Sequence, residues 1–328
     1  MKIHIVVFNL NWLGDILFSV PNLRALRHHY KESHIACIIP SAYRDLFEGQ
    51  TFIDEIIAVN DRSPYEKIKL IRHLRSRRWD IGFLFHRSKT RARIFKWGGV
   101  RERIGYNTHR RSKLLTTAIA EPSNALHKMD YLLGLIKNYG IEPVCNDYSF
   151  VPPFQDIQFP RPYVVFHPGS NWEPKKWPTH HYAKLGDHLS QKFKMNIIIT
   201  GVHSEKSCLG SMLESQMKQK CVNLCGKTNL IELANILKNA SLVVAGDTGP
   251  MHLAAAVGAP LLPLYGPTSP ELNGPRGKGV SRIIWKNPGC KTYPCADKSC
   301  PHEHCLHDLS SEEVFQTIEN WGILNAKQ

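Results

Sequence analysis

The sequence lacks several features that would place it in common protein classes. No apolar stretch approaches the roughly 18 residues of a membrane-spanning helix, and the N-terminal run IHIVVF is too short for a secretory signal. No Gly-x-Gly-x-x-Gly follows an opening strand and there is no Gly-x-x-x-x-Gly-Lys-[Ser/Thr], which argues against dinucleotide oxidoreduction and P-loop hydrolysis. Asp-x-Asp is also absent, so a metal-bridged diphosphate site is not expected.

Acidic residues are few, because 28 Asp and Glu stand against 42 Lys and Arg, for a formal net charge of +14. The excess lies in one stretch, 62–113, where 17 basic residues accompany three acidic ones, so the rest of the chain is neutral. We expect this basic stretch to face an anionic partner. A solvated basic face without a partner is the alternative interpretation.

Cysteines number nine, an odd count, and are scattered except for a late group. This usage is typical of a reducing compartment, so we expect a cytoplasmic protein. The late group recurs every five residues, which differs from the spacing of common zinc sites. Free thiols, a disulfide pair and a structural metal all stay open for its members, Cys290, Cys295, Cys300 and Cys305.

The pattern of apolar residues predicts alternating strands and helices. With 328 residues, 42% of them hydrophobic, the chain is long enough for two packed domains. The apolar run at 2–10 predicts a buried parallel strand, followed by a turn at 11–15 and a helix at 16–30. The first half continues with strands at 34–40, 55–59 and 81–85 and helices at 65–75 and 128–139.

A proline-rich stretch at 145–162 shows little helical periodicity, and we expect a linker there. The second half then repeats the alternation, with strands at 163–169, 195–201, 241–249 and 259–266 and helices at 180–193, 204–218, 230–238 and 250–257. These patterns predict an α/β protein with two Rossmann-like doubly wound domains, 1–155 and 156–308, that face each other across a cleft. A last helix within 309–328 closes the chain.

The segment GDTGPMHLAAAVGAP (246–260) offers the clearest candidate for an anion site. An apolar strand ends there, the chain turns, and Pro250 suits the first position of a helix. Free amides and the helix dipole at such a start attract phosphate. The alternative is an ordinary helix capped by Thr248 or Asp247.

Two other loops follow predicted strands, at the sheet edge where open α/β folds place ligands. In the first, Gly14 permits an unusual backbone and Asp15 stands at a helix start, where it is either functional or a simple N-cap acid. In the second, HPGSNWEPKKWPTHHYAKL (167–185), Lys175 and Lys176 either supply charge to a phosphate or are surface lysines. Ser170, Thr200 and Gly201 belong to the same expected edge of the second sheet.

Taken together, these motifs resemble glycosyltransferase family 9, the lipopolysaccharide heptosyltransferases. The resemblance rests on LNWLGDILFSVPNLRALR near the start, RIGYNTHRR (103–111), the HPGS…KKWP loop, GDTGPMHLAAAVGAP and YGPTSP (265–270). It implies the two-domain GT-B architecture, with the donor nucleotide sugar held mainly by the C-terminal domain and the acceptor by the N-terminal one. It also implies that no metal or other cofactor is obligatory.

The resemblance also assigns roles to residues. Asp15 matches the catalytic base and Lys175 the lysine that binds the donor phosphates. Asp247, Thr248, Gly249 and His252 match the donor-binding turn, to which we add Ser170, Thr200 and Gly201 from the sheet edge. The sequence departs from some relatives at KTNLIE (227–232), where Ile231 stands in place of an acid and Glu232 follows it.

The expected function is therefore an inverting, metal-independent transfer of heptose from ADP-heptose to the inner core of lipopolysaccharide, with a lipid A–Kdo acceptor. We expect the basic stretch to orient this anionic glycolipid and to bind the cytoplasmic face of the inner membrane. The acceptor-binding candidates are Gly14, Arg87, Arg91, Arg93, Arg110 and Arg111.

Three alternatives stay open: a family 9 transferase with another nucleotide sugar, a catalytically silent sugar- or nucleotide-binding relative, and a nucleic-acid-binding protein. The last has no RNP, zinc-finger or helix-turn-helix signature to support it.

Overall fold

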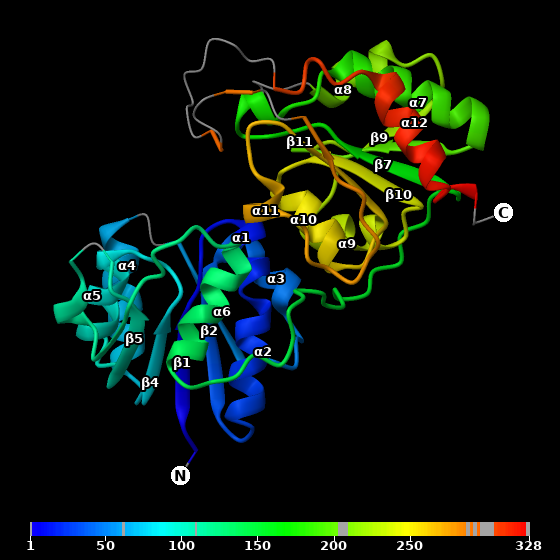
Figure 1. The fold of residues 1–328 in the computed structure, drawn as a ribbon. Coiled ribbons are helices and arrows are strands. Elements are labelled where there is room, and N and C mark those ends of the chain that lie inside the picture. The colour runs from blue at the N-terminus through cyan, green and yellow to red at the C-terminus, as the bar shows by residue number, and fades with distance from the viewer. Residues whose placement is uncertain are drawn as a thin grey trace. The chain divides into compact units, whose positions relative to one another are not determined.

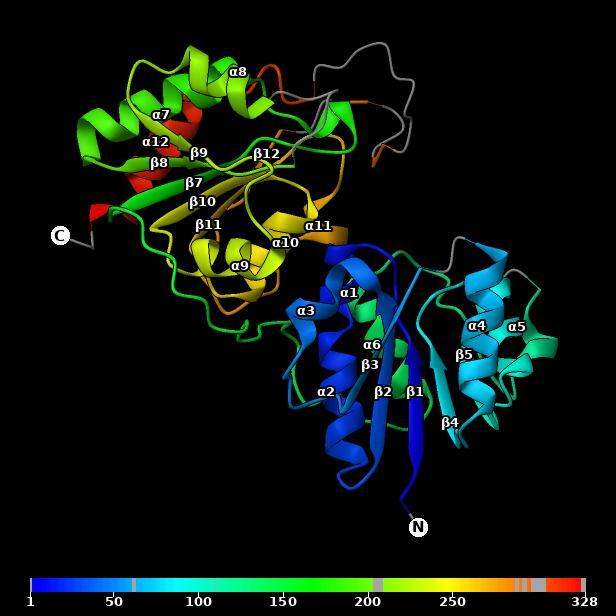
Figure 2. The same ribbon diagram turned by 180° about the vertical axis from the view of Figure 1, so that it is seen from behind.

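The computed structural model describes residues 2–60, 63–108, 110–202, 209–286, 289–290, 294–295 and 305–325. The chain forms two compact units, each a contiguous stretch of sequence, Met1–Pro153 and Phe154–Gln328 (Figures 1 and 2). Their boundary falls inside the proline-rich stretch 145–162, which contains no helix or strand. Among the described helices, none is both long and apolar enough to cross a membrane.

A six-stranded parallel sheet forms the centre of the first unit, in the order β3-β2-β1-β4-β5-β6. Its strands are β1 (His4–Phe8), β2 (His34–Pro40), β3 (Glu55–Val59), β4 (Ile81–Leu84), β5 (Glu102–Tyr106) and β6 (Thr117–Ile119). Its helices are α1 (Leu13–Phe18), α2 (Val20–His29), α3 (Arg44–Phe47), α4 (Pro64–Arg75), α5 (Lys89–Trp97) and α6 (Lys128–Asn138). Helices α1, α2 and α6 lie on one face of the sheet and α4 and α5 on the other (Figure 1).

The second unit has its own six-stranded parallel sheet, in the order β12-β11-β10-β7-β8-β9. Its strands are β7 (Tyr163–His167), β8 (Asn196–Ile199), β9 (Cys221–Asn223), β10 (Leu242–Gly246), β11 (Leu261–Tyr265) and β12 (Ile284–Trp285). Its helices are α7 (Thr179–Phe193), α8 (Leu209–Gln216), α9 (Leu230–Lys238), α10 (Gly249–Ala256), α11 (Pro270–Asn273) and α12 (Ser311–Trp321).

Both sheets have the same winding, because the strands of each unit, taken in chain order, lie in the sequence 3-2-1-4-5-6. The predicted fold class of two doubly wound α/β domains is confirmed. Such a sheet reverses its winding between its first and fourth strands, and the loops that leave these two strands separate to form a crevice. The crevice lies beyond β1 and β4 in the first unit, and beyond β7 and β10 in the second.

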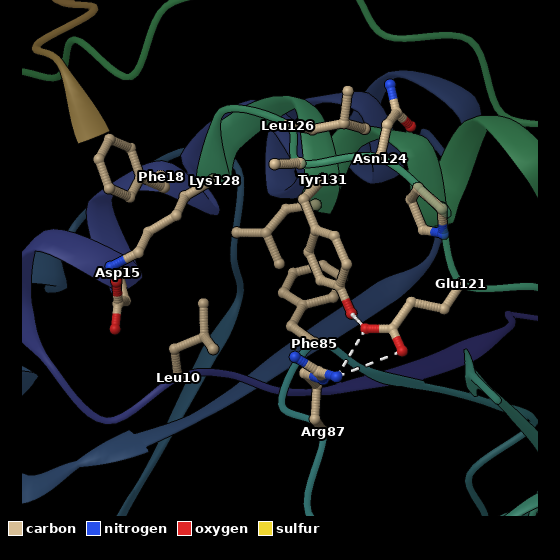
Figure 3. Close-up of a pocket in the computed structure, with 13 residues that line it drawn as sticks. Leu10, Asp15, Phe18, Phe85, Arg87, Glu121, Asn124, Leu126, Lys128 and Tyr131 are labelled. Atoms are coloured by element: carbon tan, nitrogen blue, oxygen red, sulfur yellow. Dashed lines mark hydrogen bonds and ion pairs between the residues drawn. The ribbon is translucent and has the colours of Figure 1, made fainter. Parts of the chain in front are cut away.

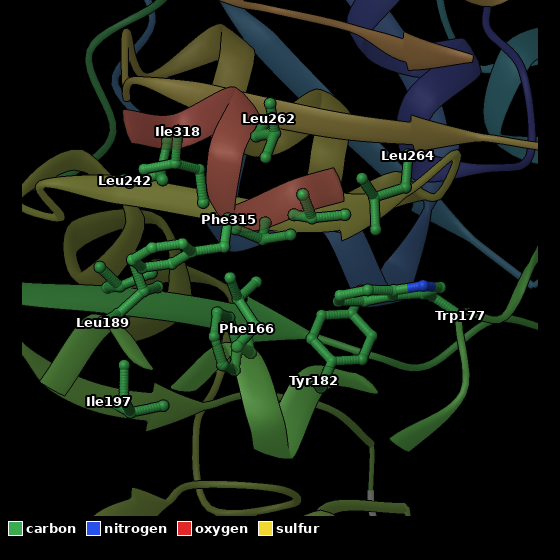
Figure 4. Close-up of a cluster of buried hydrophobic side chains, with 14 of the residues drawn as sticks. Phe166, Trp177, Tyr182, Leu189, Ile197, Leu242, Leu262, Leu264, Phe315 and Ile318 are labelled. Atoms are coloured by element: carbon green, nitrogen blue, oxygen red, sulfur yellow. The ribbon is translucent and has the colours of Figure 1, made fainter. Parts of the chain in front are cut away.

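The core of the second unit explains why the last helix belongs to it. Figure 4 shows Phe315 and Ile318 of α12 packed with Phe166 of β7, Leu189 of α7 and Leu242 of β10. Most of these side chains are shielded from solvent, which accounts for the continuous apolar character of the strands. The helix predicted to close the chain therefore completes this core.

Several expected elements differ from the structure. The helix expected at 16–30 is two helices, α1 and α2, which meet at Ser19 just before Pro21. Helix α5 and strands β5, β6, β9 and β12 were not expected from the sequence. Helix α8 is shorter than the expected 204–218, of which residues 204–208 lie outside the described part of the chain.

Candidate functional site

A pocket of about 390 Å³ lies at the crevice of the first unit (Figure 3). It is built entirely from this unit, at the ends of β1 and β4 and along α1 and α6. Both charged and apolar side chains form its wall: Leu10, Asp15, Phe18, Phe85, Arg87, Glu121, Pro122, Asn124, Ala125, Leu126, Lys128, Tyr131 and Leu132. A pocket of this size, with charged groups on an apolar wall, is typical of a small-molecule subsite.

Asp15 lies on one side of this pocket, in the first turn of α1. The N-cap of α1 is Trp12, so the interpretation of Asp15 as an N-cap acid is wrong. Its side chain is 23% exposed, and its Oδ1 lies 3.0 Å from the ammonium of Lys128. A carboxylate paired with one ammonium is therefore held at the pocket surface, where part of it is accessible.

A second charged group forms the opposite side of the pocket. Arg87 pairs with Glu121 at 2.9 Å, and the hydroxyl of Tyr131 donates a hydrogen bond of 2.8 Å to the same carboxylate (Figure 3). Burial, and then the hydrogen bond to Glu121, raise the pKa of Tyr131. Both carboxylate oxygens of Glu121 thus have partners within the protein. Arg87 keeps half of its side chain exposed.

Two arginines expected to bind the acceptor are structural. Arg91 is buried, donates to the Asn9 carbonyl and the Asn11 side chain, and stacks on the Phe8 ring. Arg111 is 0% exposed and donates to the backbone carbonyls of Tyr106 and His86 at 2.8 and 2.6 Å. Burial lowers the pKa of Arg111 to about 10. The guanidinium groups of Arg91 and Arg111 hold strand ends and loops in place and are almost completely shielded from solvent.

Gly14, Arg93 and Arg110 also lie outside the pocket wall. Gly14 is a buried residue of α1 without a positive φ, so the expectation of an unusual backbone there is wrong. Arg93 is exposed on α5, and Arg110 is exposed with a φ of 52°.

The second unit gathers the predicted donor residues at the ends of β7 and β10. The Nζ of Lys175 lies 2.7 Å from Oδ2 of Asp247, which also accepts a hydrogen bond of 2.8 Å from Thr268. His252 Nε2 lies 3.5 Å from the other oxygen of Asp247. Burial would raise the pKa of Asp247, but the hydrogen bond with His252 and the charge of Lys175 outweigh it and hold the pKa well below its usual value.

Helix α10 begins beside this cluster with its first amides available. Its N-cap, Thr248, makes no side-chain capping bond, and its hydroxyl instead donates to the Gly246 carbonyl. The interpretation of an ordinary side-chain-capped helix is therefore wrong. The amides of Gly249 and Met251 have no acceptor within the helix, so they and the dipole favour an anion at this end.

Close packing also fixes the loop that carries Lys175 against the end of β10. A Cβ on Gly246 would lie 2.7 Å from the backbone oxygen of Lys175, so only glycine lets the two loops approach this closely. The side-chain oxygen of Ser170 accepts a bond from the Trp172 amide, which shapes the loop that carries Lys175.

The remaining predicted donor residues, Thr200 and Gly201, come directly after the end of β8. Thr200 is 0% exposed, and its hydroxyl bonds to the Phe166 carbonyl and to Nδ1 of His167 at 3.1 Å. Burial lowers the pKa of His167 to about 4, so the ring is neutral. A Cβ on Gly201 would lie 3.1 Å from the Cys225 sulfur. The Thr200 hydroxyl thus links the end of β8 to the end of β7.

Sequence reasoning missed several polar site residues, among them Glu121, Lys128, Tyr131, His167 and Thr268. Glu232, considered for its place after the Lys-x-x-Leu stretch, forms a capping box with Asn229 at the start of α9. No group of three or more His, Cys, Asp or Glu side chains in the described ranges is arranged to hold a metal. Of the late cysteines, Cys290 is exposed and Cys295 and Cys305 are partly buried, while Cys300 lies outside the described residues.

Comparisons with a family model, with curated proteins and with solved structures all point to the same protein family. The model of glycosyltransferase family 9 (heptosyltransferase) matches residues 67–306. The chain is similar to lipooligosaccharide heptosyltransferase 2 of Haemophilus influenzae, with 26% identity over 96% of this chain and 98% of the relative. Its fold is similar to that of E. coli ADP-heptose LPS heptosyltransferase II, with a TM-score of 0.81, 24% identity and coverage of 100% and 99% of the two chains. It also resembles E. coli heptosyltransferase WaaC with ADP, with a TM-score of 0.76, 20% identity and coverage of 97% and 99%.

Proposed function

Because the chain belongs to glycosyltransferase family 9 and is a glycosyltransferase, we propose that it transfers heptose from ADP-heptose to the lipid A–Kdo region of the lipopolysaccharide inner core, with inversion and without a metal. The observation that carries this proposal is the partly exposed carboxylate of Asp15 in a pocket at the end of the first strand. The solved relative WaaC holds ADP, and curated relatives of the whole chain are heptosyltransferases, which supports the choice of donor.

Asp15 serves as the base on the acceptor side. Glycosyl transfer with inversion needs one group to take the proton from the acceptor hydroxyl while its oxygen attacks the anomeric carbon. Glu121, the other carboxylate of the pocket, is engaged by Arg87 and Tyr131, which leaves Asp15 for this task. A positioned base of this kind typically contributes about 10²–10⁴ to the rate.

The second unit stabilises the leaving ADP. Negative charge develops on the diphosphate as the bond to the sugar breaks, and preorganised donors stabilise such charge most effectively. The amides at the start of α10 and the ammonium of Lys175 provide these donors, and Asp247 fixes the position of Lys175. Since these groups neutralise the diphosphate, we propose that no metal is required. Transfer should then persist after dialysis against EDTA, and recovery only upon adding a divalent cation would refute metal independence.

Transfer requires both the base, which takes the proton of the acceptor hydroxyl, and the diphosphate site, which stabilises the leaving group, so removing the base alone tests the proposal. Asp15→Asn keeps the shape of the side chain but removes its basicity. We expect ADP affinity, measured by calorimetry, to stay within about twofold, while transfer from ADP-heptose falls at least 100-fold. Near wild-type transfer by this variant would remove Asp15 as the base.

A panel of nucleotide sugars, assayed with the wild-type protein by mass spectrometry, separates the alternatives. Turnover of another donor in preference to ADP-heptose would identify a family 9 transferase of different specificity. Binding of a nucleotide sugar without any transfer would identify a silent relative. Tighter binding of oligonucleotides than of any nucleotide sugar would favour the nucleic-acid-binding alternative.

We also propose a cytoplasmic protein that binds the anionic face of the inner membrane through α4 and α5. These helices lie side by side (Figure 1). The Arg75 Nε of α4 donates to the Trp97 carbonyl of α5 at 2.6 Å. Three apolar side chains protrude from them, Tyr65, Ile68 and Trp97. The same two helices carry six exposed cations, Lys69, Arg72, Arg75, Lys89, Arg93 and Lys96. Interfacial aromatic residues beside cations are typical of surfaces that bind anionic lipid.

A further inference from the structure

Lys128 occupies a position that helix energetics disfavour. It is the first residue of α6, where the helix dipole is positive and an acid is preferred. A cation here reduces helix stability, so its presence requires another explanation. The side chain leaves the helix and places its ammonium 3.0 Å from Oδ1 of Asp15, 113 residues away in the sequence (Figure 3).

Buried contacts determine this placement by fixing α6 against the N-terminal helices. His127 caps α6 by accepting a hydrogen bond of 3.1 Å from the Met129 amide, and its ring packs edge-on against Phe18 of α1 at 5.2 Å. One turn further, Asn22 of α2 donates a buried hydrogen bond of 2.7 Å to the Leu132 carbonyl. The root of the Lys128 side chain therefore has a defined position relative to the helix that carries Asp15.

We infer that Lys128 is a positioning residue for Asp15. By holding Oδ1, its ammonium fixes the rotation of the carboxylate and leaves Oδ2 directed to the acceptor hydroxyl. In the transfer step, Oδ2 receives the hydroxyl proton, the hydroxyl oxygen bonds to the anomeric carbon, and the bond to the diphosphate breaks. Lys128 neither gives nor takes a proton in this step. The inference rests on the proposed function of Asp15 as the base.

Arg87 provides a matched comparison, because it is a cation on the other side of the same pocket and does not touch Asp15. If Lys128 acts through Asp15, its loss affects the chemical step. If it bound the acceptor as Arg87 is proposed to do, its loss would affect acceptor affinity. The two roles are therefore separated by kcat and the acceptor KM.

The test uses the full-length protein with ADP-heptose and lipid A–Kdo acceptor. We expect Lys128→Met to lower kcat about 10- to 100-fold with the acceptor KM and ADP affinity within about twofold, since small displacements of a catalytic group have effects of this size. Lys128→Arg should restore kcat to within about threefold. Arg87→Met should instead raise the acceptor KM with little change in kcat.

Two further measurements complete the test: the unfolding temperature of Lys128→Met and the activity of a variant that combines it with Asp15→Asn. Because Lys128 opposes the helix dipole, Lys128→Met should unfold at the same temperature as the wild type or higher. If Lys128→Met proves insoluble, Lys128→Gln takes its place. Adding Lys128→Met to Asp15→Asn should cause no further loss of kcat, since the base that Lys128 positions has already lost its basicity.

An unchanged kcat, a loss confined to the acceptor KM, or multiplicative losses in the double variant would overturn the inference. Full activity of Asp15→Asn would instead overturn the proposed function. An inactive Asp15→Asn beside a wild-type-like Lys128→Met would refute only the role of Lys128.

Discussion

The ammonium of Lys175 lies 2.7 Å from the carboxylate of Asp247, at the end of the strand that leads into α10. Asp247 is 7% exposed and lies within reach of Thr268 and His252, so it is a fixed anchor for the lysine. The pair thus places a positive charge beside the free amides of α10 before any diphosphate binds.

Lys175→Ala should therefore weaken ADP binding about 10- to 100-fold, the effect of losing one charge-assisted hydrogen bond. Isothermal titration calorimetry measures this change directly. The control is Lys176→Ala, since the neighbouring ammonium pairs with Glu173 at 2.5 Å and does not contact Asp247. Equal ADP affinity in Lys175→Ala and the wild type would assign the diphosphate to other residues.

Arg111→Met should lower the free energy of unfolding by about 2–4 kcal/mol, because the carbonyls of Tyr106 and His86 lose their buried donor. The exposed Arg93→Met should change it by less than about 0.5 kcal/mol. Urea denaturation of the two variants compares a structural and a surface arginine of the same basic stretch. Equal free energies of unfolding for the two variants would refute the structural role assigned to Arg111.

The buried His167 should make stability depend on pH. Its pKa is about 4 in the folded protein and near 6.5 when unfolded, so between these values the unfolded chain binds the extra proton. Stability therefore falls as the pH decreases from 6.5 toward 4, by about 2 kcal/mol at pH 5.

His167→Gln removes this titration, so the decrease between pH 7.5 and pH 5 in urea denaturation should be smaller by about that amount. The exposed His180→Gln serves as the control. An identical decrease in wild type and His167→Gln would show that His167 is already protonated or solvated in the fold.

Replacing Lys69, Arg72 and Arg93 by Gln should weaken binding to vesicles containing phosphatidylglycerol about 10- to 100-fold, at about 1 kcal/mol per cation or less. Co-sedimentation at two salt concentrations measures the effect. The same charge change at exposed positions of the second unit, Lys184, Lys220 and Lys238, is the control. Equal losses in both triple variants would point to net charge and exclude a specific surface on α4 and α5.

Much of the fold and half of the site follow from local sequence. The apolar runs identify the central strands, and Asp15 and Lys175 each lie in or just after the loop that follows one of these strands. A doubly wound sheet places such residues at its ligand-binding edge. Their location was therefore predictable without knowledge of tertiary contacts.

The rest depends on contacts between distant segments. Lys128 and Tyr131 come from α6, whose packing on α1 brings Lys128 to Asp15 and Tyr131 to the other side of the same pocket. No local pattern encodes this arrangement. The basic stretch shows a related limit. Arg91 and Arg93 lie two residues apart on α5, a helix that was not expected. Arg91 is buried, whereas Arg93 is exposed. Sequence proximity made these two residues appear equivalent, although only Arg93 reaches the surface.

The two units repeat one winding, and the chain crosses between them once. Under the proposed assignment, the first continuous half of the chain selects the acceptor, and the second continuous half binds the nucleotide. Divergence in glycolipid preference among relatives should then accumulate before position 154, while the half that follows stays comparatively constrained by its shared nucleotide.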